Sequence, residues 1–257
     1  MLSIITVINK WDVFCKGLQA SLDLQIDVEY EVIAIDNTES KYSSMASALN
    51  EGIDKAQGDW ILFCHPDIEF RQNHELSNIM DTVEILDKKN DNIGLYGAAG
   101  VEDSQTKKFI STIVHGKEKS QIPNSEAPNG EFASVFTVDA CFFIIKKSII
   151  SEYKFDETIK GFHFHTEELC FRLRKNGYKL AVISMKLWHY SSGASLDYTY
   201  YKAARKVMRK YKNERLVLTT SFRWKNNVFS RTKLYIYQAR NYAHHKLVRQ
   251  DKKVGKG

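Results

Sequence analysis

The sequence predicts an α/β fold in which a mixed, mostly parallel sheet is flanked by helices and followed by a basic helical C-terminal extension. Three observations predict it. Apolar, β-branched runs alternate with helix-period runs, the first three apolar runs each stop at polar residues, and basic residues crowd the end of the chain. With 257 residues, 43% of them hydrophobic, we expect one large domain over 1–200 and an extension over 201–257.

The first third of the chain alternates strand and helix patterns. Strands are expected at residues 3–8, 30–35 and 60–64. Between the first two, Phe14, Leu18 and Leu22 recur at the spacing of one helix face. A second helix is expected over 45–56, with Ser43 or Ser44 as its N-cap and Gly58 beyond its end. Strand–helix–strand units of this length form parallel sheets with right-handed crossovers.

The remaining elements are less regular. Helices are expected at 76–86, 167–176, 198–212 and 232–248, and strands at 93–99, 135–145 and 178–183. Residues 102–132 are polar and contain Pro123, Pro128 and Gly130, which indicates a mobile loop or lid.

Charge is distributed unevenly along the chain. Residues 202–257 contain 17 Lys and Arg against Glu214 and Asp251, a net +15, so the whole-chain value of +6 leaves 6 − 15 = −9 for residues 1–201. This tail either faces an anionic membrane surface or acceptor, or is a solvated helical face. Nucleic acid is a weaker candidate partner, because the body is acidic.

The cysteine content and the hydrophobic pattern also indicate the cellular compartment of the protein. The four cysteines are widely spaced without a CxxC pair, which argues against a disulfide framework or a zinc site. The first residues lack a signal-peptide pattern, and no apolar run approaches a membrane-spanning length. We therefore expect a cytoplasmic protein, soluble or peripheral at the inner face of the membrane.

Polar residues follow each of the first three predicted strands. Asn9, Asp36 and Asp67 come directly after them, and ligands in parallel α/β sheets bind at the carboxyl ends of strands. The third strand ends in WILFCHPDIEF, where acids follow a buried run. Carboxylates bind hard divalent cations and such cations bind phosphates, so this segment predicts a metal holding a phosphorylated ligand. The alternative is a strand followed by an ordinary polar turn.

Two further acidic positions stand out. Asp139 interrupts an otherwise apolar strand, and so lies at a sheet edge or contacts a ligand, because an unpaired buried acid is costly. Glu167 and Glu168 open a helix, where the dipole favours carboxylates. Capping explains one glutamate well and two less well, because adjacent like charges repel.

The order of these features resembles the GT-A glycosyltransferases of family 2, in a streptomycin-biosynthesis-like branch, over roughly residues 3–193. The pieces that carry the resemblance are SIITVINKW, EVIAIDNTES, ALNEGIDKAQGDWILFCHPDIEF, VDACFFIIKKSII, FDE, and HFHTEELCFRL with GYKL. No single piece is diagnostic, but together they stand in the family's order.

The resemblance implies a GT-A domain that binds a nucleotide-sugar donor, a UDP- or dTDP-sugar, through Mn²⁺ or Mg²⁺. Asp67 matches the last acid of the family's DxD-type motif, and His189 resembles a late histidine that completes the metal shell in some members. The implied donor-site residues are Thr6, Ile8, Asn9, Trp11, Asp36, Asn37, Asn50, Asp67 and Asp139.

The resemblance also implies an inverting transfer to a glycan, glycolipid or glycoprotein acceptor. Glu168, with Glu167 beside it, matches the family's catalytic base, which deprotonates the acceptor hydroxyl. Thr166 replaces a preceding family acid, and His65 and Pro66 depart from the usual acids before Asp67. The alternative is therefore an inactive homologue that binds a nucleotide sugar or a partner.

Overall fold

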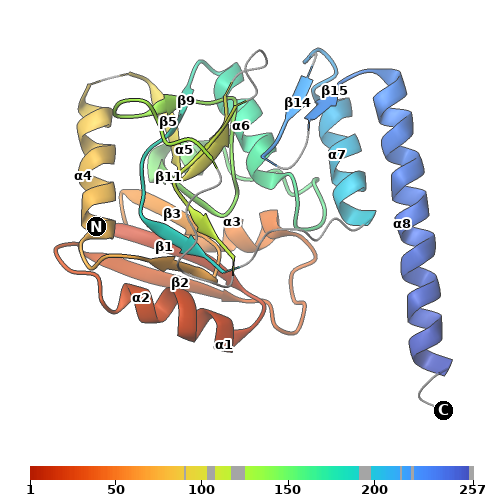
Figure 1. Ribbon diagram of the computed structural model, residues 1–257, viewed down its shortest axis with the longest axis horizontal. Helices are drawn as coiled ribbons and strands as arrows, with labels where there is room; N and C mark the ends of the chain where they lie inside the picture. The colour runs from red at the N-terminus through yellow and green to blue at the C-terminus, as the bar shows by residue number, and fades with distance from the viewer. Residues whose placement is uncertain are drawn as a thin grey trace.

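A seven-stranded mixed sheet lies at the centre of the computed structural model, which describes residues 1–89, 91–102, 108–116, 125–190, 198–214, 216–220 and 223–254 (Figure 1). Its strand order is β2-β1-β3-β11-β5-β12-β9. These strands are β1 (Leu2–Ile8), β2 (Tyr30–Asp36), β3 (Trp60–Cys64), β5 (Ile93–Gly97), β9 (Ala133–Ser134), β11 (Phe142–Lys146) and β12 (Lys179–Val182). The expected parallel pairing of β2, β1 and β3 is confirmed, whereas β11 runs antiparallel to both of its neighbours.

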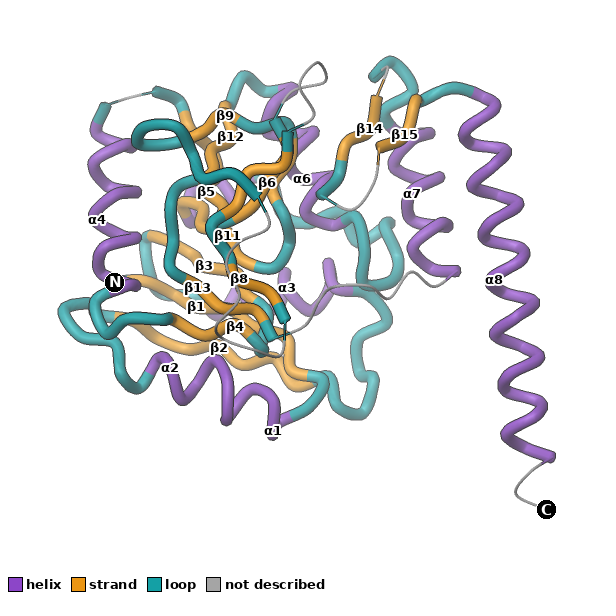
Figure 2. The backbone as a smooth tube through the Cα atoms, in the orientation of Figure 1, coloured by secondary structure: helices purple, strands orange, loops and turns teal. Residues whose placement is uncertain are grey.

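Eight short strands form three smaller sheets. One sheet joins β4 (Ile68–Phe70), β13 (Leu187–His189) and β8 (Val114–His115), which lie side by side in Figure 2. The others join β10 (Thr137–Val138), β6 (Ala99–Val101) and β7 (Phe109–Ser111), and β14 (Leu216–Leu218) with β15 (Arg223–Lys225). Strands β7 and β8 therefore lie in the segment expected to be a loop. Residues 103–107 and 117–124 of that segment are outside the described part of the chain.

Helices cover both faces of the large sheet. One face packs against α1 (Trp11–Phe14), a π-helical turn (Cys15–Gln19), α2 (Ala20–Leu22) and α4 (Glu75–Lys88). The other face packs against α3 (Met45–Lys55), α5 (Lys147–Glu152) and α6 (His165–Lys175). Strand β3 shows why both faces are covered, because its apolar side chains point to both sides. Leu62 and Cys64 lie in the apolar cluster on the first face, and Ile61 and Phe63 lie in the cluster on the other face.

The expected strand over 135–145 is broken in two at Asp139. Its carboxylate Oδ1 accepts a hydrogen bond from the Cys141 backbone N–H at 2.9 Å, which turns the chain between β10 and β11. A short polar side chain that bonds a backbone group two residues later favours a turn over a continuous ladder. The break leaves Asp139 in the turn between β10 and β11, outside both strands.

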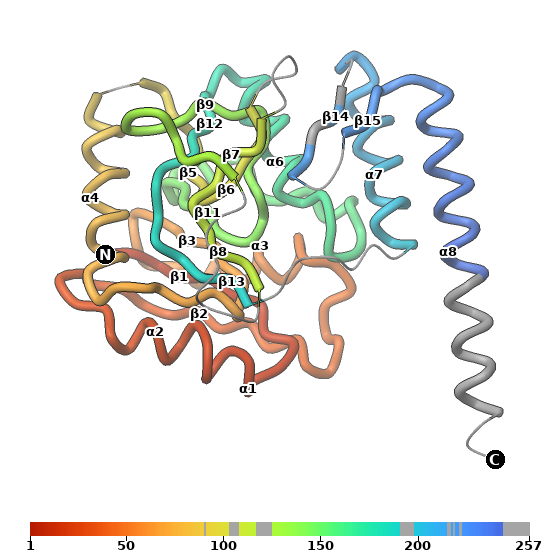
Figure 3. The backbone as a smooth tube through the Cα atoms, in the orientation of Figure 1, coloured from red at the N-terminus to blue at the C-terminus, as the bar shows by residue number. Residues whose placement is uncertain are grey.

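Two basic helices follow the sheet, α7 (Tyr198–Lys210) and α8 (Val228–Val254). Helix α7 lies between the body and α8, and α8 is outermost (Figure 3). A third apolar cluster joins Phe164 and Phe171 of the body to Val207 of α7 and Leu234 of α8. The boundary predicted at residue 200 therefore falls inside α7, and this helix is part of the packed body. Among the described residues, no helix is both long and apolar enough to cross a bilayer.

Candidate functional site

Two histidines and an aspartate meet beyond the end of β3. His65 and Asp67 lie in the turn between β3 and β4, and His189 ends β13, which pairs antiparallel with β4 so that His189 faces Ile68. Each of the three side chains offers one ligand atom within 4.8 Å of the other two. His189 Nε2 lies 3.3 Å from Asp67 Oδ1, with the side chains 6% and 15% exposed. The register of β4 and β13 thus brings together residues more than a hundred positions apart.

The cluster has the properties of a divalent-cation site. His189 Nε2 is buried and makes no hydrogen bond of good geometry within the described structure, although an unsatisfied buried nitrogen is costly. Burial raises the pKa of the Asp67 carboxyl, but His189 and His65 outweigh it, and the net pKa is below the usual value. Imidazole nitrogens with one carboxylate suit Mn²⁺ better than Mg²⁺. The residues present therefore fit the metal that the family resemblance implies.

His115 contacts the cluster through His189. Strand β8 runs parallel to β13 with His115 opposite His189, and the two Nδ1 atoms are 3.2 Å apart. One Nδ1 must donate and the other accept, so a proton on His189 Nδ1 leaves Nε2 free to bind a cation. A hydrogen bond to the second ring nitrogen is the usual way in which proteins orient a metal-binding histidine. No motif in the sequence pointed to this contact.

Asp139 interacts electrostatically with His65 of the histidine cluster and with Glu167 of α6. Its Oδ2 accepts a short hydrogen bond from the Thr220 hydroxyl, contributed by the segment after β14. Burial raises the pKa of Asp139, but the hydrogen bonds from Thr220 and Cys141 and the nearby His65 lower it overall. The charge of Asp139 in turn acts on Glu167. The C-terminal segment therefore helps to hold an acid of the predicted donor site.

The start of α6 presents a half-buried carboxylate. Phe164, which precedes the helix, has a left-handed backbone with φ 65°, and its ring lies 4.9 Å from that of Tyr200 in α7. Such a backbone is strained for a bulky residue, and packing must hold it. Burial, with a contribution from Asp139, raises the pKa of Glu167 from 4.5 to about 7. Glu167 is thus poised to accept a proton near neutral pH.

Glu168, the residue that matched the family's base, occupies a different environment. Its side chain is 0% exposed and its carboxylate accepts hydrogen bonds from Lys210 Nζ at 2.5 Å, Tyr211 Oη at 2.7 Å and Arg172 Nε at 3.0 Å. Lys210 also bonds Asp156 Oδ2 at 2.7 Å. The carboxylate is therefore neutralised and sealed by α7, contrary to our expectation that it faces an acceptor.

Trp11 and Asp36 meet at the carboxyl ends of β1 and β2. The Trp11 indole Nε1–H points to Asp36 Oδ2 at 3.3 Å, and 44% of Trp11 is exposed. Asp36 Oδ1 accepts hydrogen bonds from the backbone N–H and hydroxyl of Thr38, each at 2.8 Å, and these lower the pKa of Asp36. An exposed indole beside a carboxylate offers stacking and hydrogen bonding to a nucleoside. Asn9, directly after β1, is exposed at the same edge.

Four other predicted donor contacts have structural side chains. Thr6 and Ile8 are fully buried, and Ile8 belongs to the apolar cluster beneath α1. The Asn37 amide bonds the backbone of Tyr42, and the Asn50 amide bonds the backbone of Phe155 and the Glu157 carboxylate. Their side chains therefore stabilise the fold, and a contact of these four residues with the donor stays a prediction.

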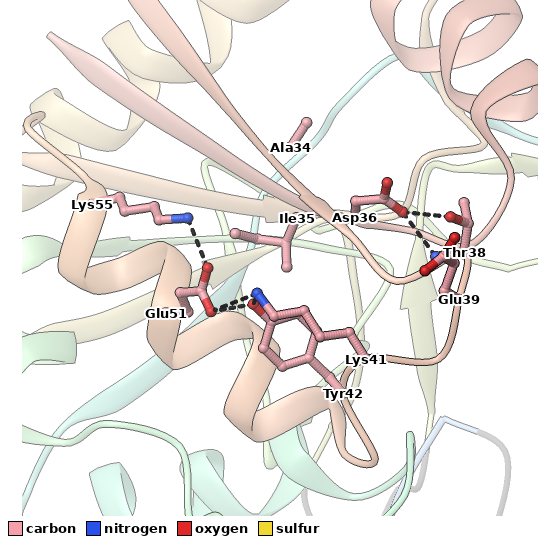
Figure 4. Close-up of a pocket in the computed structure, with 9 residues that line it drawn as sticks. All are labelled: Ala34, Ile35, Asp36, Thr38, Glu39, Lys41, Tyr42, Glu51 and Lys55. Atoms are coloured by element: carbon pink, nitrogen blue, oxygen red, sulfur yellow. Dashed lines mark hydrogen bonds and ion pairs between the residues drawn. The ribbon is translucent and has the colours of Figure 1, made fainter.

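A hollow of about 340 Å³ lies on the outer side of β2, where it meets α3. Figure 4 shows that three of its charged side chains pair with each other, Glu51 with Lys55 at 2.7 Å and with Lys41 at 3.6 Å. It contains Asp36 but none of the residues of the histidine cluster or of α6. We therefore do not assign the donor phosphates to this hollow.

Comparison with known proteins identifies the family and the fold of the chain. A family model described as "Glycosyltransferase like family" matches residues 3–211. A curated protein of Fuscovulum blasticum, "ATP synthase subunits region ORF 6", is 23% identical over 188 residues, 71% of each chain.

Solved structures share the fold at low identity. S. aureus TarS 1–349 in complex with UDP-GlcNAc is 14% identical with a TM-score of 0.55, over 86% of this chain and 68% of that one. GalNAc-T7 with UDP, GalNAc and Mn²⁺ is 12% identical with a TM-score of 0.59, over 81% and 47%. PcManGT, a mannosyltransferase from Pyrobaculum calidifontis in complex with GDP-Man and Mn²⁺, is 11% identical with a TM-score of 0.53, over 83% and 64%. This chain spans 41% of the longer TarS structure. The chain therefore has the GT-A fold and belongs to the glycosyltransferase-like family.

Proposed function

We propose that the protein transfers a sugar from a nucleotide-sugar donor to an acceptor hydroxyl. The observation that carries this proposal is the cluster of His65, Asp67 and His189 beyond the end of β3, with Asp139 acting electrostatically on both His65 and Glu167. A glycosyl transfer needs these two parts, a place for the diphosphate and a base for the acceptor. The Mn²⁺-containing relatives of the same fold support the choice of metal.

On this proposal the donor lies along the carboxyl ends of β1, β2 and β3. The exposed Trp11 indole stacks on the base, and Asp36 accepts a hydrogen bond from the base or ribose. His65, Asp67 and His189 hold Mn²⁺ or Mg²⁺, which when bound neutralises the leaving diphosphate. We propose a uridine or thymidine diphosphate sugar. The His-containing motif at 65–67 favours the streptomycin-biosynthesis-like branch.

Glu167 is the proposed base, in preference to Glu168. Its carboxyl takes the proton of the acceptor hydroxyl as that oxygen bonds to the anomeric carbon, and the bond from that carbon to the diphosphate breaks. A single carboxylate in this role gives inversion at the anomeric carbon. Its pKa of about 7 matches this task near neutral pH, whereas Glu168 is already neutralised by Lys210 and Arg172. The acceptor we propose is a glycan, glycoprotein or glycolipid, on the cytoplasmic side of a membrane in the lipid-linked case.

The second candidate is a binding homologue without turnover, favoured by His65 in place of an acid and by Thr166 before the glutamates. Thermal shift and nucleotide release separate the two. The protein is incubated with UDP-, dTDP- and GDP-sugars in Mn²⁺, Mg²⁺ or EDTA. Asp67→Asn is compared with Asp81→Asn, which changes an exposed acid on α4.

Metal-dependent stabilisation and slow donor hydrolysis, lost only in Asp67→Asn, are expected for an enzyme. Stabilisation without hydrolysis, persisting when candidate acceptors are added, would favour the binding homologue. No response of the wild type to any donor would remove both candidates.

A further inference from the structure

The outer face of α8 carries an exposed apolar stripe. Phe229, Ile236 and Val228 are 77%, 51% and 71% exposed, and Tyr235 and Tyr242, 56% and 46% exposed at its border, contact Arg205 and Tyr198 of α7. In contrast, Leu234 on the opposite face is fully buried against α7. Large apolar side chains at this exposure normally mark a contact surface when they are contiguous.

The spacing makes the stripe contiguous. Residues 229, 232, 236, 239 and 243 recur every three or four positions and so share one helix face. Tyr235 and Tyr242 lie on one border of this face, seven residues or two helical turns apart. Lys233 and Arg240 lie on the other border with the same separation. All of these positions are exposed. The helix therefore presents an apolar centre with aromatic hydroxyls on one side and cations on the other.

The charge of the segment decides what can cover it. The sequence from 215 to 250 contains eight Lys and Arg and no Asp or Glu. A second copy of this helix would bring cations against cations, with only Thr232, Ala239 and Ala243 between the larger side chains. An anionic lipid surface complements both features, because headgroup phosphates attract Lys and Arg while Phe, Ile and Tyr enter the acyl boundary.

We propose that α8 lies in the plane of an anionic bilayer, with Phe229 and Ile236 inserted and with Lys233 and Arg240 at the level of the phosphates. This surface does not depend on donor chemistry, so its test needs no sugar and no turnover. Because α8 packs on α7, and α7 reaches Glu168 through Lys210, the bilayer would orient the whole body and not a loose tail.

The test measures co-sedimentation of the full chain with large vesicles of phosphatidylcholine alone, or with 30 mol% phosphatidylglycerol, at roughly 0.1 M salt. Phe229→Ala/Ile236→Ala removes the apolar centre without removing a charge, and Lys233→Gln/Arg240→Gln removes two charges without removing the stripe. Ile85→Ala/Lys88→Gln is the matched control, because Ile85 is 53% exposed on α4, far along the chain. All four side chains on α8 are exposed or point outward, so folding is checked by unchanged thermal midpoints.

We expect the wild type and the control to bind the anionic vesicles and to release them at high salt. Each lost cation should lower partitioning about fivefold, so the charge variant should lose roughly 25-fold. The apolar variant should lose at least about tenfold. Failure of the wild type to bind, or equal binding by all variants, would overturn the proposal. So would a stable dimer that Phe229→Ala/Ile236→Ala converts to a monomer, since a second copy would then be the occupant.

Discussion

The same substitution at the two adjacent glutamates at the start of α6 should affect different properties, the stability at one position and the turnover at the other. Glu167 is half-buried with a pKa raised to about 7, and Glu168 is sealed among Lys210, Tyr211 and Arg172. We predict that Glu168→Gln lowers stability and that Glu167→Gln lowers turnover. The two variants control for each other, because each replaces one carboxylate oxygen by an amide nitrogen at neighbouring positions of the same helix.

The cost of Glu168→Gln can be worked from its contacts. Removing one partner of a buried ion pair costs about 3–5 kcal/mol. Here Lys210 is 38% exposed and keeps Asp156, and Arg172 is 23% exposed and keeps the Lys154 carbonyl at 2.7 Å, so the cost falls below this range. We expect a loss of about 2–3 kcal/mol, which for a chain of this size lowers Tm by roughly 4–12 °C. Differential scanning calorimetry at pH 7 measures it.

Glu167→Gln should leave Tm near the wild-type value at pH 5 and lower kcat by about 10²- to 10⁴-fold, the usual contribution of a general base. In the wild type, kcat/KM should rise with pH through about 7 as Glu167 loses its proton. The sign for stability is the opposite. The pKa is higher folded than unfolded, so the folded state holds the extra proton, and stability should fall as pH rises from 4.5 to about 7. That dependence should weaken in Glu167→Gln.

The reasoning fails if the outcomes are exchanged. A Glu168→Gln variant with wild-type Tm and no turnover, beside a fully active Glu167→Gln, would mean that Glu168 meets the acceptor. α7 would then have to move away from the site during the reaction.

Three further predictions concern the metal cluster and the donor edge. His189→Ala should abolish Mn²⁺-dependent thermal stabilisation, measured with Mn²⁺ alone and with EDTA as the reference; an unchanged shift would exclude His189 as a ligand. His115→Phe should weaken Mn²⁺ binding about 10- to 100-fold by calorimetry, with partial recovery in His115→Asn, since it orients His189 across 3.2 Å. Trp11→Ala should raise the donor KM with little change in kcat, because its exposed indole contributes to binding and not to chemistry; a fall in kcat alone would contradict this.

Much of the fold could be predicted because its signals are local. The continuous apolar run of β3 follows from burial of both faces of the strand, and the four-residue spacing of Phe14, Leu18 and Leu22 follows from burial of one helix face, so both patterns are visible in the sequence. The reversed direction of β11 could not be predicted, because an apolar run of this kind is equally compatible with either pairing. Asp139 was the clue to a break, but its turn depends on a hydrogen bond to Cys141.

The site was only partly predictable, because some of its residues are placed by local signals and others by contacts between distant segments. Asp67 and Trp11 follow directly after strands, so their placement at the sheet edge follows from topology. The roles of His65 and His115 depend on the pairing of β13 with β4 and β8, which no local pattern encodes. Likewise, the choice between Glu167 and Glu168 rests on Lys210 at the end of α7 and on Tyr211 after it, and the sequence placed both residues in a separate extension.

The dependence of Glu168 and Asp139 on the C-terminal segment also has a consequence for biosynthesis. Lys210 follows Glu168 by 42 positions, and Thr220 follows Asp139 by 81. At roughly 5–20 residues per second, a ribosome makes Glu168 several seconds before the cation that neutralises it. The nascent sheet can form in that interval, but α6 cannot pack stably while the Glu168 carboxylate is buried without its cationic partner. A chain interrupted near residue 200 should therefore be a substrate for proteolysis and not a smaller working domain.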